Sequence, residues 1–328
     1  MSEDALTHPV RPHPGRPHSG RPLSHVAGAP KLSDWIALLK PRVLVLVVYT
    51  GLIGLILAPG HLSGMEGITA ILCITGAAGA CGAINMWYDR DIDIIMRRTR
   101  NRPIPAGRVT PDAALWYGIT LATTSIIVMG VVLNLTAALA LLFSVGFYVF
   151  VYTVWLKRRT PQNIVIGGAA GALPPVIGWA AATGSISLTA LVLFGIIFIW
   201  TPPHFWALAL WANNDYRQAG IPMLPVVSGA RETRRQILAY TAVLVPLSTA
   251  PYFLGSNGLP YLVASLLFGA VFLWRSWQVL TDRQDDDGVS LTGDKPAKLA
   301  FRYSVIYLFA LFGALAVDHW MAAALSGR

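Results

Sequence analysis

The sequence predicts an all-α polytopic membrane protein with about nine transmembrane helices. Of its 328 residues, 55% are hydrophobic and only 12% are charged, and the mean hydropathy is +0.56. The hydrophobic residues fall in runs of about 20, the length of a helix that crosses a hydrocarbon core of about 30 Å. Strands of a membrane barrel would need only about half that length, so helices are indicated.

Polar segments separate these runs and divide the chain. Residues 1–30 are rich in Pro, His, Arg, Gly and Ser, a composition too poor in apolar side chains to offset the entropy of folding. We expect a disordered cytoplasmic tail at 1–30 and one transmembrane domain at 31–328. The expected spans are residues 42–58, 67–88, 112–132, 135–155, 163–182, 188–211, 237–255, 259–280 and 299–324.

The basic residues predict the orientation. They gather in the tail and after the second, fourth, sixth and eighth spans, whereas the alternate connections contain no Lys or Arg. The positive-inside rule then places the N terminus in the cytoplasm, in a multi-pass protein of the cell inner membrane. Because topology explains the net charge of +9, we expect the lipid bilayer as a partner and no nucleic acid.

A polar cluster, NMWYDRDID, closes the second span at residues 85–93. At 100° per residue, Asn85, Asp89 and Asp93 lie along one stripe of the helix, while Asp91 points to the other side. Neighbours on the stripe are about 6 Å apart, which suits two ions or one bridged complex. Mg²⁺ is usually held by one or two carboxylates together with phosphate oxygens, so the stripe fits a magnesium diphosphate. The alternative is a solvated helix end.

Arginine recurs between residues 90 and 108, more often than topology alone requires. Guanidinium groups bind phosphate oxygens in bidentate geometry and can stabilise charge on a departing diphosphate. Composition does not separate phosphate ligands from arginines that only mark the cytoplasmic side. The candidate ligands are Arg97, Arg98 and Arg102.

These motifs resemble the UbiA superfamily of membrane prenyltransferases, whose first signature, N-x-x-x-D-x-x-x-D, is matched by Asn85, Asp89 and Asp93. The blocks NMWYDRDIDIIMRRTRNRPIPAGRV, VYTVWLKRRTPQNIVIGGAAGALPPVIGW and WTPPHFWALALWANNDYRQAGIPMLPVV resemble its protohaem IX farnesyltransferase branch in particular. Together they cover the transmembrane body without the tail and the last two spans.

The resemblance implies a fold, substrates and a cofactor. The fold would have nine helices around a central cavity open to the cytoplasmic side. The substrates would be farnesyl diphosphate and haem B, the cofactor Mg²⁺, and the product haem O for cytochrome oxidase. Haem A synthase or cytochrome oxidase assembly factors are candidate partners.

The second aspartate site of the superfamily, D-x-x-x-D, is incomplete here. Asp215 is followed four residues later by Ala219. Asp215 therefore either assists a metal or orients Asn214 and Arg217, which we count with it as substrate-binding candidates.

Further candidates lie at the ends of the fourth and sixth spans. By resemblance, Lys157 contacts the diphosphate, whereas we interpret Arg158 and Arg159 as topological anchors. The faces of Tyr148 and Tyr152 either stabilise an allylic cation or form part of an aromatic belt.

His204 is set inside the sixth span, after Pro202 and Pro203, which we expect to kink the helix. An ionisable group in a membrane suggests function, so we count His204 as catalytic: it would ligate haem iron, hold a propionate or act as a base. The alternative is a hydrogen bond within the broken helix. Small-residue runs at 76–83 and 167–172 suit either an isoprenoid groove or close helix packing.

The sequence therefore predicts a Mg²⁺-dependent transfer of farnesyl to the vinyl group of haem B. A second hypothesis keeps the donor but has another aromatic or quinone-precursor acceptor. A third, of another class, is a haem or ion transporter. The charged residues lie at the predicted cytoplasmic helix ends, not at the midplane where transporters bind their substrates, so chemistry is favoured.

Overall fold

The computed structural model describes residues 29–286 and 288–325, so nearly all of the predicted tail, residues 1–28, lies outside the described part. The described chain is helical, and its one isolated β-bridge joins Gln284 to Ser290. The elements are α1 (Leu32–Leu38), α2 (Pro41–Leu57), α3 (Gly64–Tyr88), α4 (Arg90–Ile95), α5 (Pro111–Val128), η1 (Met129–Leu133), α6 (Leu135–Gly146), η2 (Phe147–Leu156), α7 (Asn163–Ala172), α8 (Pro174–Thr183), α9 (Leu188–Trp211), α10 (Asn213–Gln218), α11 (Leu224–Val227), α12 (Gly229–Ser248), α13 (Ala250–Phe253), α14 (Leu259–Leu280) and α15 (Lys295–Leu325).

Seven helical segments among the described residues are long and apolar enough to cross a membrane. They are 64–88, 111–133, 135–156, 163–183, 188–211, 259–280 and 295–325, and the pair α1 and α2, bent by 56°, gives an eighth. Each coincides closely with an expected span. The chain is thus a multi-pass helical membrane protein. The remaining expected span, 237–255, is the seventh along the chain and overlaps α12, whose first turns are charged, so the count of nine stays a prediction.

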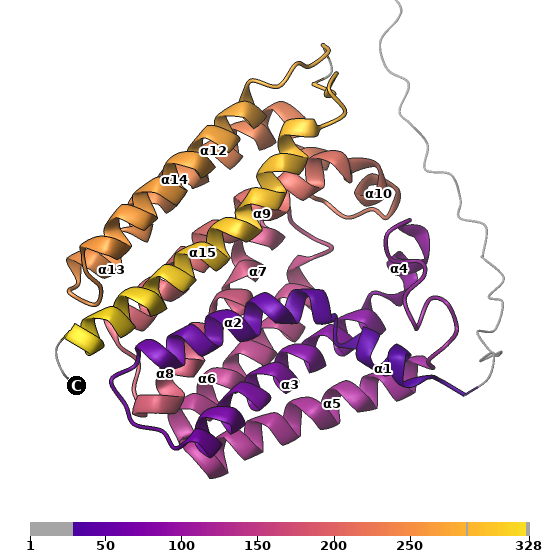
Figure 1. Ribbon diagram of the computed structural model, residues 1–328. Coiled ribbons are helices and arrows are strands. Elements are labelled where there is room, and N and C mark those ends of the chain that lie inside the picture. Colours follow the sequence, from indigo (N-terminus) through magenta and orange to yellow (C-terminus); the bar gives the residue numbers. More distant parts are fainter. Residues whose placement is uncertain (1–28, 287, 326–328) are drawn as a thin grey trace, which may run out of the picture.

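The helices run roughly side by side in an elongated bundle. Figure 1 shows α12, α14 and α15 on one side and α2, α3 and α5 on the other, with α7 and α9 between them. The core cluster draws on both sides, from Ile53 and Ile74 to Leu193, Phe272 and Phe312. Buried apolar packing between long helices therefore holds the two sides together.

Glycine allows the closest helix contacts. A Cβ atom at Gly54 of α2 would lie 2.2 Å from the Pro175 carbonyl oxygen of α8, and one at Gly178 would lie 2.1 Å from the Gly51 oxygen. In the small-residue run of α3, a Cβ at Gly82 would lie 2.9 Å from the Leu38 carbonyl oxygen. Close helix packing thus accounts for Gly82 in the predicted small-residue run 76–83, and for Gly54 and Gly178 outside the predicted runs.

Several spans change helical form along their length. The segments η1 and η2 are π-helical, and α7 gives way to α8 at Pro174. By contrast, α9 continues as one helix through Pro202 and Pro203, so these prolines do not end it, and the kink expected there stays a prediction.

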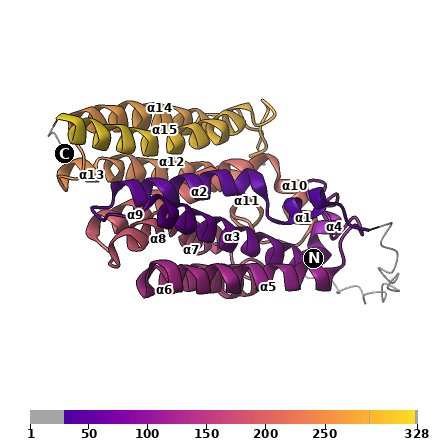
Figure 2. The same cartoon turned by 60° about the horizontal axis from the view of Figure 1, so that its bottom comes forward.

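The short helices α1, α4 and α10 lie at one end of the bundle, which we call the polar end (Figures 1 and 2). The connection between α14 and α15 is at this end, whereas α13 and the C-terminal end of α15 lie at the opposite end. The first described residues and the last are therefore at opposite ends of the bundle.

A buried carboxylate closes the opposite end. Asp318 of α15 is 5% exposed and accepts hydrogen bonds from the Gly258 backbone N (2.6 Å), the Tyr261 backbone N (3.3 Å) and Asn257 Nδ2 (3.1 Å). Gly258 is the N-cap of α14 and Tyr261 lies in its first turn, where free backbone N–H groups attract a negative charge. Asp318 therefore joins α14 to α15 as a cap supplied from another helix.

Candidate active site

The carboxylate stripe predicted from the sequence lies on one buried face. The chain passes from α3 to α4 with its helical phase nearly kept, because Asp89 N bonds to Asn85 O (2.9 Å) and Asp93 N bonds to Asp89 O (2.8 Å). Asn85, Asp89 and Asp93 are 3%, 0% and 2% exposed, whereas the Asp91 side chain is 60% exposed. Buried carboxylates need charged or polar partners, so the groups that face them define the site.

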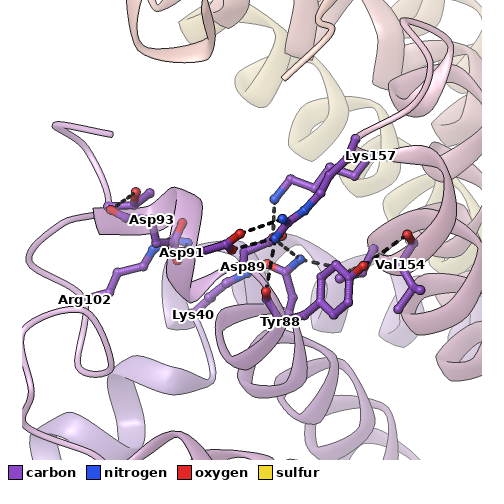
Figure 3. A network of polar contacts seen from close by, with 12 residues as sticks. Lys40, Tyr88, Asp89, Asp91, Asp93, Arg102, Val154 and Lys157 are labelled. Atoms are coloured by element: carbon purple, nitrogen blue, oxygen red, sulfur yellow. Dashed lines mark hydrogen bonds and ion pairs between the residues drawn. The ribbon is translucent and has the colours of Figure 1, made fainter. Parts of the chain in front are cut away.

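Two lysines from different segments approach the first half of this stripe (Figure 3). Lys157 forms an ion pair with Asp89 through Oδ2, which also accepts a hydrogen bond from Asn85 Nδ2 at 2.8 Å. Lys40 donates from Nζ to Asn85 Oδ1 at 2.6 Å, and Thr153 contacts the same amide. Asn85 thus links Lys40 to the carboxylate that Lys157 binds directly.

An arginine holds the other end of the stripe. Arg102 donates to Asp93 Oδ2 at 2.7 Å, and the Thr99 hydroxyl donates to the Asp93 carbonyl oxygen at 2.9 Å. Arg97 and Arg98 are exposed, and neither forms an ion pair with another described residue. Of the three predicted phosphate ligands, only Arg102 therefore contacts the stripe.

Arg158, interpreted from the sequence only as a topological anchor, also makes specific side-chain contacts. Its guanidinium group binds both oxygens of Asp91 at 2.7 Å, donates to the Tyr88 carbonyl oxygen, and lies 4.9 Å from the centre of the Tyr88 ring. These hydrogen bonds hold the pKa of Asp91 below its ordinary value, although partial burial opposes them. Arg158 fastens η2 to the start of α4.

The two predicted tyrosines lie together along η2. Their ring centres are 5.3 Å apart. A Cβ atom at Gly167 of α7 would lie 2.2 Å from the ring of Tyr152, so this glycine leaves the space that the ring occupies. Tyr148 and Tyr152 precede Lys157 by about two turns and one turn of helix.

The second polar loop packs against the first. Ile92 and Met96 from the α4 region share an apolar cluster with Ile164 of α7 and Tyr216 of α10. This cluster brings the two polar segments to the same place.

Among the described residues, those predicted on α10 nevertheless make no hydrogen bond or ion pair with the stripe. Asp215 is half-buried and makes no side-chain hydrogen bond or ion pair within the described chain, and Asn214 and Arg217 are exposed. Their assigned roles stay predictions.

His204 contacts a different set of residues. Its ring stacks between Trp200 (4.4 Å) and Phe301 (4.6 Å), and its Nδ1 is 2.7 Å from the Ser304 hydroxyl of α15. The hydrogen bond within its own helix, which was the alternative to a functional role, is not the one observed, because the partner lies on the neighbouring helix. The structure does not join His204 to the carboxylate stripe, and its Nε2 makes no hydrogen bond within the described chain.

The donor chemistry of the site fits Mg²⁺. Asp89 Oδ1 has one long contact, to Arg158 at 3.5 Å, and Asp93 Oδ1 has none within the described residues, so each carboxylate keeps an oxygen for another ligand. Within the described part of the chain, the buried amide oxygens of Asn163 and Asn213 also have no hydrogen-bond partner. Residues 29–286 and 288–325 contain no group of three His, Cys, Asp or Glu side chains arranged for a metal. That is consistent with Mg²⁺, which takes one or two carboxylates and completes its shell with phosphate and water.

Lys40 is the site residue that the sequence analysis missed. It was counted only among the basic residues that mark topology, because nothing in its neighbourhood suggests a contact 45 residues along the chain. A local signal does exist: Lys40 has a positive φ of 55° and directly precedes Pro41. A non-glycine residue in this conformation is uncommon and often has a functional reason.

Comparisons with known proteins identify the family of this chain. Residues 47–305 match the model of the UbiA prenyltransferase family. A protein of Acidiphilium cryptum named protoheme IX farnesyltransferase is 63% identical over 287 residues, 88% of this chain and 90% of its own. One of Granulibacter bethesdensis with the same name is 58% identical over 91% of this chain and 94% of its own.

Solved structures share the fold at low sequence identity. A UbiA homologue from Aeropyrum pernix superposes with a TM-score of 0.67 at 18% identity, over 84% of this chain and 97% of its own. One from Archaeoglobus fulgidus, solved with GPP and Mg²⁺ bound, gives 0.61 at 17% identity, over 86% and 99%. The family match, the identity to the bacterial relatives and the shared fold lead to one conclusion: this chain belongs to the UbiA prenyltransferase family.

Proposed function

We propose that this protein transfers the farnesyl group of farnesyl diphosphate to the vinyl group of haem B, giving haem O and diphosphate. The observation that carries the proposal is the buried stripe of Asn85, Asp89 and Asp93, which basic side chains from three separate segments approach. The acceptor is inferred from the name of relatives up to 63% identical over most of the chain.

The residues of the stripe would hold a magnesium diphosphate. Asp89, Asp93 and Asn85 supply oxygen ligands, with Asp215 as a further candidate from α10. The bound Mg²⁺ would withdraw electron density from the diphosphate and make it a better leaving group. Mg²⁺ dependence thus belongs to the proposal and follows from the donor chemistry of these side chains.

The basic residues would serve the leaving group. With its partner carboxylate occupied, Lys157 can turn its ammonium group to the diphosphate, and Arg102 can do the same from the Asp93 end of the stripe. Lys40 completes the set near Asn85, and Arg97 and Arg98 are free to join from the loop. Preorganised cations stabilise charge as it develops, and the allylic C–O bond then ionises.

The acceptor step completes the reaction. The terminal vinyl carbon of haem B attacks C1 of the farnesyl cation and forms the new C–C bond. Water adds to the resulting benzylic-like carbon and loses one proton to solvent or a base, leaving a hydroxyethylfarnesyl group. The π faces of Tyr148 and Tyr152 are suited to the allylic cation, and His204 is the candidate for contact with haem through its Nε2.

The proposed location is the cell inner membrane, with the polar end of the bundle in the cytoplasm. The positive-inside distribution supports this orientation, because the basic connections gather at the polar end. Farnesyl diphosphate would then reach the stripe from the aqueous side that supplies it.

One assay separates this proposal from its rivals. The purified protein in proteoliposomes is given farnesyl diphosphate, haem B and Mg²⁺, and haem O and free diphosphate are quantified together. The proposal predicts equal amounts of both products. Diphosphate release only with a quinone precursor in place of haem B would indicate another acceptor, and haem movement across the bilayer without either product would indicate a transporter.

A further inference from the structure

Helix α1 lies against the beginning of the site, at the polar end (Figure 1). It is seven residues long, bends by 56° into α2, and packs its fully buried Leu38 against α3. Gly79 and Gly82 of α3 permit this approach, since a Cβ atom on either would lie 3.0 Å or less from Leu39 or Leu38. The opposite face of α1 exposes Leu32 and Ile36.

An ion pair joins α1 to the arginine-bearing loop between α4 and α5. Arg108 donates from Nε to Asp34 Oδ1 at 2.6 Å, and from Nη2 to the Asn101 carbonyl oxygen at 2.9 Å. Asp34 is 7% exposed, and its second oxygen accepts from the Lys31 backbone N. One guanidinium group therefore holds α1 and the loop together.

Each residue of this ion pair belongs to a segment that also carries a cation of the site. On the α1 side, the chain continues to Lys40, whose left-handed backbone (φ 55°, ψ 59°) turns the side chain to Asn85. On the loop side, Asn101 precedes Arg102, which binds Asp93. The two cations thus reach opposite ends of the stripe from segments that share one link.

We propose that the Asp34–Arg108 ion pair is a positioning device for the allylic diphosphate: it sets Lys40 and Arg102 at the two ends of the carboxylate stripe. This inference rests on the proposed function for the identity of the ligand. Asp34 and Arg108 touch neither substrate nor reacting atoms, so their loss weakens binding of the diphosphate more than it slows the chemical step.

Charge reversal tests the claim on the purified full-length protein. The variants are Asp34→Arg, Arg108→Asp and the double variant, measured for Kd of farnesyl diphosphate with Mg²⁺ in the absence of haem, and then for KM and kcat. Each single variant is expected to raise Kd and KM about tenfold with kcat within about twofold, and the double variant to restore most of the affinity. Glu232→Arg, in the exposed pair with Arg235 on α12, is the matched control and leaves all three constants unchanged.

Three results would overturn the inference. The first is a Kd that is unchanged in both single variants, and the second is a double variant that binds as weakly as the single variants. The third is a parallel loss of affinity, kcat and thermal stability, which would mark a purely structural role. The failure of the proposed function is distinguishable. If the wild-type protein binds farnesyl diphosphate but makes no haem O, haem B is not the acceptor. The Kd values of the wild type and the variants then still decide the role of the ion pair. A wild-type protein that does not bind the diphosphate refutes both.

Discussion

Replacing Asp89 by Asn removes one negative charge from a side chain with no exposed surface and leaves its shape unchanged. In the wild type, Asp89 Oδ2 accepts from both Lys157 and Asn85. Breaking a buried ion pair by neutralising one partner typically costs about 3 to 5 kcal/mol. If that interaction supports the metal diphosphate in the transition state, kcat/KM for haem O formation falls roughly 10²- to 10⁴-fold.

Asp91→Asn is the matched control, two residues away on the same short segment. Its carboxylate is 60% exposed and its pair with Arg158 is open to solvent, so about 0 to 1 kcal/mol is at stake and activity falls at most about fivefold. Haem O is quantified by chromatography after incubation with farnesyl diphosphate, haem B and Mg²⁺, at equal amounts of folded protein. The reasoning fails if Asp89→Asn keeps activity within fivefold of wild type, or if both variants lose equal activity.

Two further substitutions test other parts of the structure. Lys40→Met removes the cation that reaches Asn85 and should raise KM for farnesyl diphosphate about tenfold. The control is Lys31→Met, at an exposed lysine on the same segment, which should leave KM unchanged. Equal KM values in the two variants would show that Lys40 is not part of the site. Asp318→Ala deletes the cap of α14 and should lower the free energy of unfolding by about 2 kcal/mol, seen as a lower thermal midpoint of the detergent-solubilised protein. Asp112→Ala, an exposed carboxylate in the first turn of α5, should change it by no more than about 0.5 kcal/mol, and a loss as large as that of Asp318→Ala would contradict the capping role.

The sequence predicted the spans well because the bilayer imposes one strong requirement, a long apolar run. The expected run 188–211 is α9 to the residue, and 259–280 is α14. The start of α12 was placed at 237, whereas the helix begins at Gly229. Its first turns contain Arg234, which is 1% exposed and bonds to the Gly288 carbonyl oxygen of a distant loop. Burial of that arginine depends on a tertiary partner that hydropathy does not report.

The candidate site was also predictable only in its local part. Helical periodicity placed Asn85, Asp89 and Asp93 on one face because their spacing of four is a local property of the helix. The partners of that face come from segments that meet only in three dimensions: Lys157 lies 68 residues from Asp89, and Lys40 lies 45 from Asn85. A positive-inside count treats such residues alike, so it could not distinguish Lys40 or Arg158 from a topological anchor.

Equilibrium binding of farnesyl diphosphate to the purified protein, with and without Mg²⁺ and in the absence of haem, tests the central claim most directly. We expect the wild type to bind the diphosphate tightly only when Mg²⁺ is present, and Asp89→Asn to bind it weakly with little or no gain from the metal. Binding by Asp89→Asn that is as tight and as Mg²⁺-dependent as that of the wild type would contradict the assignment of the buried stripe to the metal diphosphate.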